Sequence, residues 1–256
     1  MKRLLILLSV FALLGVIGYS GYRLQDINQN TAQEAELHRW LMQFHPMLQA
    51  SPSDEPAPAL LAERAPVPQV NQSILDLQAE FPDAVGWLTI PNTEVDYPFV
   101  QGTDNDYYLR RDLHQQRASA GTVFMDYRNN SGFSDFHTLI YGHHMRSGSM
   151  FAALQKFDDQ AFFEANPTGT IFLTNATYEI EFMAFAVIRP NDAMIYDPLI
   201  TTAEDKIAFL GYVRDIARHY RDIGTAENDR IVTLSTCNYE FNNARMVLIG
   251  RIVQNG

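Results

Sequence analysis

The stretch Ile231-Val-Thr-Leu-Ser-Thr-Cys237-Asn-Tyr-Glu240 joins an expected β-strand to a candidate reactive residue. Residues 231–236 are apolar and rich in β-branched side chains, which favour strands. Cys237 follows at the carboxyl end of this run, where a rigid scaffold commonly presents reactive groups to a loop. A lone cysteine is also often a small buried hydrophobe, so Cys237 needs a partner before it can be interpreted as a nucleophile.

Working outward from this strand, seven further runs share its character. They are short, rich in Val, Ile, Phe and Tyr, and bounded by Gly, Pro or Asn. These runs are 87–90, 95–100, 122–127, 138–141, 170–174, 178–188 and 246–253. Eight strands with few helices between them predict a mainly β domain, a mixed barrel with peripheral helices, rather than a parallel α/β sheet.

Three helices are expected beside these strands. The first, over residues 74–81, is stopped by Pro82. Ser149 is expected to cap a second, which carries Met150, Leu154 and Phe157. A third begins with the pair Thr202 and Asp205, which resembles a capping box, and its apolar positions continue to Tyr220.

Composition excludes several classes of function. The 256 residues carry a net charge of −11, and an acidic chain repels the phosphate backbone of nucleic acids. The 46% hydrophobic content is ample for a packed core. A single cysteine excludes an internal disulfide, a structural multi-cysteine zinc site and an iron–sulfur cluster, because each needs more thiolates.

The N-terminus predicts a membrane anchor at residues 1–23. Lys2 and Arg3 precede nineteen uncharged residues, 4–22, and a helix of that length covers about the ~30 Å hydrocarbon core. The basic start places the N-terminus in the cytoplasm and the rest of the chain outside it. The alternative is a cleaved signal peptide, which the basic start and the Leu-rich stretch also suit.

Residues 24–70 are expected to link this anchor to the main domain, residues 71–256. The first part, 26–44, has an amphipathic helical pattern. The second, 46–68, holds six of the twelve prolines and predicts an extended, semi-rigid spacer.

Two residues are candidate partners for Cys237. His143 follows the 138–141 strand and Gly142, which is expected to form a turn, and it has His144 beside it. Neighbouring strand residues point to opposite faces, so at most one of the two histidines faces a given site, and a polar loop or a metal ligand is the alternative. Arg245 begins the 246–253 run, where it is either a solvated strand end or a donor to a developing oxyanion.

At these residues the sequence resembles the class B sortases of bacterial cell envelopes. The resemblance covers roughly residues 74–253, with several motifs in the order of the family. The motifs are Gly86-Trp-Leu-Thr-Ile-Pro91, Val95-Asp-Tyr-Pro98, Asp104-Asn-Asp-Tyr-Tyr-Leu109, Gly121-Thr-Val-Phe-Met-Asp-Tyr-Arg128, Tyr141-Gly-His-His-Met145, Ser147-Gly-Ser-Met-Phe151, Leu234-Ser-Thr-Cys-Asn-Tyr-Glu-Phe241 and Ala244-Arg245.

The resemblance implies an eight-stranded β-barrel and a cysteine transpeptidase at the outer face of the cell membrane. His143, Cys237 and Arg245 match the catalytic positions of the family. Positions that line the groove for the sorting peptide correspond to Asn105, Leu109 and Ser235. The loop that holds Ile195 and Tyr196 can reach this groove and is given no role. The chemistry implied needs no metal or cofactor.

The implied reaction cleaves a C-terminal sorting signal after Thr, forms a thioester with Cys237, and transfers the acyl group to an amine of the cell wall or of a pilin. Surface proteins or pilins that carry such a signal are the expected partners. Two alternatives are a cysteine endopeptidase that releases the peptide to water, and a membrane-tethered binding domain without catalysis. The sorting motif and the acceptor are not specified by the sequence.

Overall fold

The computed structural model describes residues 2–46, 70–237 and 244–254. The chain divides into two compact units, Met1–Gln43 and Phe44–Gly256. The predicted divisions at residues 23 and 70 stay predictions. The proline-rich spacer expected at 46–68 lies outside the described residues apart from Pro46.

The first unit consists of helix α1, Lys2–Leu41, which is followed by the short 3₁₀ helix η1, Met42–Phe44. We expected separate helices at 4–22 and 26–44. The helix continues between them because Arg23, Leu24 and Gln25 are all good helix formers. As for the membrane anchor predicted at residues 1–23, no helix of the described residues is long and apolar enough to cross a bilayer.

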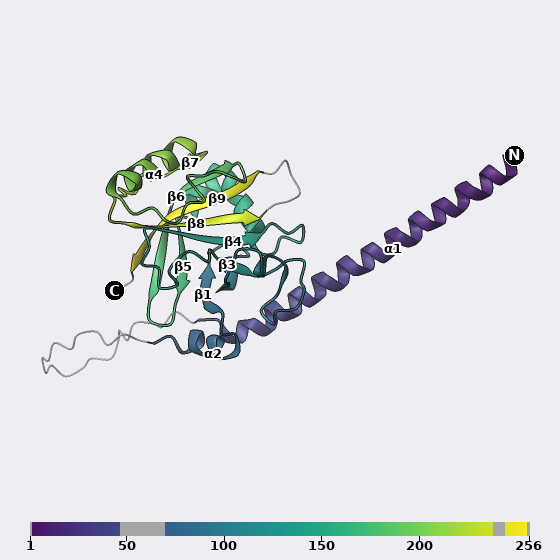
Figure 1. Cartoon of the computed structure of the whole chain (residues 1–256), viewed down its shortest axis with the longest axis horizontal. Coiled ribbons are helices and arrows are strands. Elements are labelled where there is room, and N and C mark those ends of the chain that lie inside the picture. The colour runs from purple at the N-terminus through teal and green to yellow at the C-terminus, as the bar shows by residue number, and fades with distance from the viewer. Residues whose placement is uncertain (1, 47–69, 238–243, 255–256) are drawn as a thin grey trace, which may run out of the picture. The chain divides into compact units, whose positions relative to one another are not determined.

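The second unit is a β-barrel (Figure 1). Within the described residues, nine strands form one sheet in the order β5-β1-β2-β3-β4-β8-β9-β6-β7, and an additional pairing of β5 with β6 closes eight of them into the barrel. The strands are β1 Ala84–Thr89, β2 Asp96–Gln101, β3 Val123–Met125, β4 His137–His143, β5 Thr168–Phe172, β6 Thr177–Ile188, β7 His219–Tyr220, β8 Arg230–Cys237 and β9 Arg245–Gln254. The mainly β fold and all eight predicted strands are confirmed.

Strand β7 was not predicted. Its two residues pair with Ala184 and Phe185 on the half of β6 that β5 leaves uncovered. Tyr220 therefore lies in a strand, and the predicted helical continuation to this residue is wrong. Helix α4, Ala203–Ile216, ends earlier. Its start is as predicted, since the amide of Asp205 donates to the hydroxyl of Thr202.

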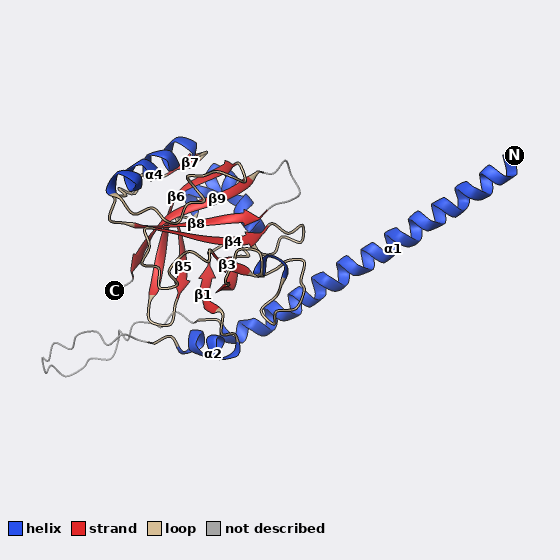
Figure 2. Ribbon diagram, viewed as in Figure 1, coloured by secondary structure: helices blue, strands red, loops and turns tan. Residues whose placement is uncertain are grey.

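The other helices lie around the barrel (Figure 2). They are α2 Gln72–Glu80, η2 Tyr108–Arg110, η3 Phe151–Asp158 and α3 Gln160–Ala165. The cap predicted at Ser149 is wrong, because η3 is a 3₁₀ helix whose preceding residue, Met150, has a φ of 57° and no side-chain cap. The Ser149 hydroxyl instead lies 2.8 Å from that of Ser147.

Two apolar layers hold the barrel together. One fills its interior with side chains that include Phe99, Ile140 and Leu234. The other lies between α4 and the outer face of the sheet, where Phe209 and Val213 of the helix join Val247 of β9. Figure 1 shows α4 alongside β6 and β9. The outer face of β4 and β8 is thus buried at one end of these strands, and the candidate site lies at the other.

Candidate functional site

The three predicted catalytic residues lie at the ends of three adjacent strands. β4 and β8 run parallel, and His143 and Cys237 are Cα partners at the end of their ladder. β8 and β9 are antiparallel with Ser235 opposite Val247, so two further residues along the same register align Cys237 with Arg245. The Met246 amide donates to the Thr236 hydroxyl over 3.0 Å, which holds these two strand ends together. The side chain of Cys237 lies outside the described part of the chain.

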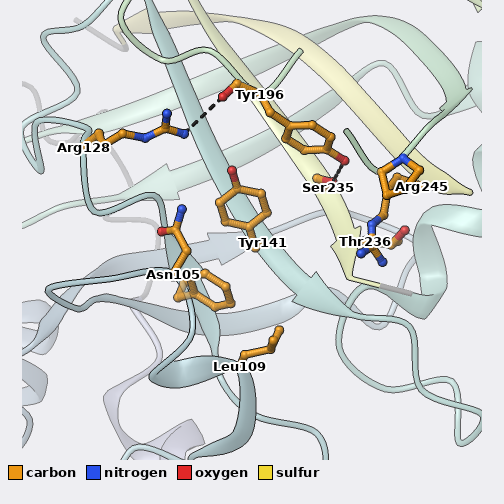
Figure 3. Close-up of a pocket in the computed structure, with 10 residues that line it drawn as sticks. Asn105, Leu109, Arg128, Tyr141, Tyr196, Ser235, Thr236 and Arg245 are labelled. Atoms are coloured by element: carbon orange, nitrogen blue, oxygen red, sulfur yellow. Dashed lines mark hydrogen bonds between the residues drawn. The ribbon is translucent and has the colours of Figure 1, made fainter. Parts of the chain in front are cut away.

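A pocket of about 290 Å³ opens beside these strand ends (Figure 3). Its lining combines apolar and polar side chains from six separate parts of the chain. The lining residues are Asn105, Leu109, Phe124, Arg128, Tyr141, Pro190, Tyr196, Ser235, Thr236 and Arg245. In Figure 3 the Arg245 side chain lies beside Thr236, toward the end of β8.

His143 adjoins the pocket through Leu109. Its Nε2 lies 2.6 Å from the Leu109 carbonyl oxygen. A carbonyl can only accept, so Nε2 carries the hydrogen of this bond. Gly142 before it lies within β4 rather than in the predicted turn. A Cβ on residue 142 would meet the Phe151 ring at 2.6 Å. The Phe151 ring can therefore pack beside His143 only because residue 142 is glycine.

His144 is held away from this arrangement. Its Nε2 lies 3.1 Å from the Gln155 side-chain oxygen. The two adjacent histidines therefore have different partners, as alternation along a strand requires.

The floor of the pocket is organised by the fully buried carboxylate of Asp126. It accepts hydrogen bonds from Asn105 over 2.9 Å, from the Tyr141 hydroxyl over 3.0 Å, and from two nitrogens of Arg128 over 2.8 Å each. Burial opposes ionisation of this group, but the hydrogen bonds from Arg128, Asn105 and Tyr141 outweigh burial and lower the pKa of Asp126. Burial, together with the same carboxylate, raises the pKa of Tyr141 well above its usual value.

The segment between β6 and α4 forms the opposite wall. The Tyr196 hydroxyl lies 2.9 Å from the Ser235 hydroxyl, and its ring stacks on Tyr141 with centroids 6.3 Å apart. Arg128 donates to the Tyr196 carbonyl over 3.1 Å. Figure 3 shows Tyr141 between these groups and the side of the pocket that carries Asn105 and Leu109.

The structure brings the six predicted site residues to one end of the barrel. Asn105, Leu109, Ser235 and Arg245 line the pocket, and His143 bonds to Leu109. Sequence analysis missed Arg128 and Tyr141 as pocket residues and gave Tyr196 no role. Arg128 and Tyr141 both stand in quoted motifs, which was the available signal, but their shared contact with Asp126 depends on the pairing of β3 with β4.

Metal ligation finds no support among the described side chains, where no group of three or more His, Cys, Asp or Glu residues is placed to hold an ion.

Comparison with known proteins agrees with this fold and site. The sequence matches the Sortase domain family over residues 88–253. It is 41% identical to sortase B of Listeria monocytogenes over 72% of this chain and 76% of the relative, and 25% identical to sortase B of Staphylococcus aureus over 99% and 98%.

Solved structures give the same result. Sortase B of Bacillus anthracis in complex with AAEK1 superposes with a TM-score of 0.74 at 26% identity, over 89% of this chain and 99% of that one. Sortase B of Listeria monocytogenes gives 0.63 at 40% identity over 69% and 98%. The sortase B–substrate complex of Staphylococcus aureus gives 0.69 at 26% identity over 73% and 87%.

The chain belongs to the sortase family. Its relatives and structural neighbours are of class B, so the protein is a class B sortase, a cysteine transpeptidase. The two alternatives considered from the sequence, a peptide hydrolase and a non-catalytic binding domain, are not favoured.

Proposed function

We propose that Cys237, His143 and Arg245 carry out two successive acyl transfers on a C-terminal sorting signal. The observation that carries this assignment is the parallel register of β4 and β8, which makes His143 and Cys237 partners at the strand ends beside the pocket. Arg245 lines that pocket from the next strand. Cysteine chemistry at neutral pH needs such a neighbour, because an ordinary thiol is mostly protonated there.

In the first transfer, the Cys237 thiolate attacks the carbonyl carbon of a Thr in the signal. The charge that develops on the carbonyl oxygen is held by the guanidinium of Arg245, the first residue of strand β9. As the C–N bond breaks, the leaving amine takes a proton from the His143 imidazolium. The products are a thioester on Cys237 and the released C-terminal fragment.

In the second transfer, an amine of the cell wall or of a pilin attacks the thioester. His143, now neutral, takes the proton that the amine loses. The C–S bond breaks, an amide forms, and the thiolate is restored. The hydrogen bond from Nε2 to Leu109 supports this role, because it keeps the ring in one orientation while Nδ1 exchanges the proton.

The pocket is proposed to bind the residues of the signal before the cleaved bond. Leu109, Phe124 and Pro190 offer an apolar wall, and Asn105 and Ser235 offer polar groups to a peptide backbone. Asn105 is already fixed at both ends of its amide, since it donates to Asp126 and accepts from the Tyr127 amide. A preorganised amide of this kind favours one peptide register.

The test incubates the full-length chain with Asn-Pro-x-Thr-x and Ser-Pro-x-Thr-x peptides, with and without diaminopimelate or oligoglycine, and records the intact mass. The expected result is a mass gain equal to the peptide cut after Thr, which the amine discharges into a linked product. Cys237→Ala should abolish the adduct. No adduct with any peptide, while the thiol still reacts with a small probe, would contradict the proposal.

Arg245 has a matched control on the same strand. Arg245→Gln should slow acylation by roughly 10²–10³-fold, as loss of one oxyanion donor typically does. Arg251, near the other end of β9, pairs with Glu181 instead. Arg251→Gln should leave the acylation rate within about twofold, and an equal loss in both variants would refute the specific role of Arg245.

We also propose that residues 1–23 hold the protein in the cell membrane with its N-terminus in the cytoplasm and residues 71–256 outside. Support comes from the uncharged run 4–22 behind Lys2 and Arg3. The partners would be surface proteins or pilins with a sorting signal. Protease added to intact cells should digest the barrel domain only if it lies outside, and full protection would overturn this orientation.

A further inference from the structure

A second histidine on strand β4 has no part in the chemistry described above. His137 is fully buried, and both of its ring nitrogens have partners. Nδ1 lies 2.9 Å from the Asp197 carbonyl oxygen, and Nε2 lies 2.8 Å from the Thr233 hydroxyl. The carbonyl can only accept, so Nδ1 donates to it, and in the neutral ring Nε2 then accepts from the Thr233 hydroxyl. These roles belong to one neutral tautomer of the ring.

The surroundings of His137 enforce that state. Burial lowers the pKa of His137 to about 4, against smaller opposing contributions from Asp197 and Asp126. The centroid of the His137 ring lies 4.4 Å from the ring centroid of Phe209 on helix α4. The His137 ring is therefore a fixed, uncharged donor at any pH near neutrality.

His137 bonds to the segment that forms one wall of the pocket. Asp197 belongs to the segment between β6 and α4, directly after Tyr196, whose carbonyl accepts from Arg128. Two consecutive carbonyls of this segment are thus bound from the barrel by two different side chains. Ile195, the preceding residue, is fully buried.

These contacts also restrain Tyr196, which lines the pocket. With Asp197 and Ile195 fixed on either side of it, Tyr196 has little freedom, and its hydroxyl reaches Ser235 while its ring stacks on Tyr141. One bond of His137, to Thr233, stays within the barrel on the neighbouring strand β8. The other directs a donor to the backbone of the segment that lines the pocket.

We propose that His137 is a positioning residue. It fixes the segment 190–199 in the position that binds the peptide and thereby sets the affinity for the sorting signal. The second part rests on the proposed function, which assigns the pocket to that peptide. The first part concerns only the segment and can be measured without substrate.

Two variants separate the two hydrogen bonds of the ring. The amide nitrogen of Asn occupies about the place of Nδ1, so His137→Asn keeps the donor to Asp197. The longer Gln places its amide near Nε2, so His137→Gln keeps Thr233 and loses Asp197. Thr233→Val is a third variant, which removes the Thr233 contact and leaves the ring and its bond to Asp197 in place.

In the full-length chain, we expect His137→Gln to raise KM for the peptide roughly threefold to tenfold, the equivalent of one hydrogen bond, with kcat within about twofold. Backbone hydrogen exchange over residues 189–200 should become faster in the same variant. His137→Asn and Thr233→Val should stay close to the wild type in both measurements. Alkylation of Cys237 by iodoacetamide should be unchanged in all three.

Equal KM values for His137→Asn and His137→Gln would overturn the effect on affinity. Wild-type exchange over 189–200 in His137→Gln would overturn the positioning role itself. If the wild type forms no acyl-enzyme with any peptide, the proposed function fails, and the exchange measurement still decides whether His137 holds the segment.

Discussion

Strand β4 carries a histidine at each end, and the two side chains have opposite surroundings. His137 at the first end has no exposed surface, two fixed partners and a pKa lowered to about 4 by burial. His143 at the other end is half-buried and bonds through Nε2 to the Leu109 carbonyl at the edge of the pocket. The two residues are six apart, so alternation along the strand gives them the same face of the sheet.

The difference lies in how each imidazole is covered and bonded. A ring that α4 and the 190–199 segment cover is locked in one neutral tautomer and serves as a rigid donor. The ring of His143, at the pocket end of the strand, keeps Nε2 bonded to the Leu109 carbonyl and is proposed to exchange a proton at Nδ1. Residue type alone does not separate these two roles.

Replacing the imidazole of His143 should have the largest effect, and it tests the difference between the two ends of β4. His143→Gln keeps a donor toward Leu109 but cannot transfer a proton, so the acylation rate should fall by roughly 10²–10⁴-fold while the melting temperature changes little. His144→Gln is the matched control and should stay within about twofold, because His144 contacts Gln155 instead. A loss in His137→Asn as large as that in His143→Gln would refute the division between the two ends.

The acid dependence of stability should come from His137, at the first end of β4. As pH falls, the unfolded chain protonates this histidine near its ordinary value of 6.5, whereas the folded chain does so only at about 4. Stability contributed by neutral His137 is therefore complete above pH 6.5 and is lost between pH 6.5 and 4, by roughly 3 kcal/mol in total.

Denaturant unfolding of the wild type and of His137→Asn at several pH values measures this loss. The nearby Asp197 and Asp126 are present in both proteins, so the difference between the two curves isolates the histidine. Parallel curves between pH 7 and 4 would show that His137 does not titrate in this range.

A smaller effect is expected from the backbone beside His143. In Gly142→Ala the new Cβ would meet the fully buried Phe151 ring at 2.6 Å, so β4 or η3 must shift, at a cost of about 1–3 kcal/mol. Gly211→Ala, at an exposed position of helix α4 with nothing within 4 Å, should instead stabilise the protein by up to about 1 kcal/mol. Urea titration of both variants compares them, and a neutral Gly142→Ala would show that the site tolerates movement of this strand.

Local pattern was sufficient for the strands because each buries a run of apolar or β-branched side chains whatever its neighbour is. It failed where pairing decided the outcome. His219 and Tyr220 became a strand only because part of the edge of β6 is left open by β5. The helix after Met150 begins without a side-chain cap, and Met150 itself has a φ of 57°, which a local capping pattern does not reveal.

The mainly β class, the eight barrel strands, the family, and the residues that stand at strand ends with reactive side chains could all be predicted from the sequence. These follow from local preference, alternation and motifs, each of which is written within a few consecutive residues. Only the tertiary structure decided that Asn105, Tyr141 and Arg128 share one buried carboxylate, and that Tyr196 reaches Ser235. It also separated His137 from His143, because burial and the partners of an imidazole depend on segments that are distant in the chain and meet only when the barrel closes.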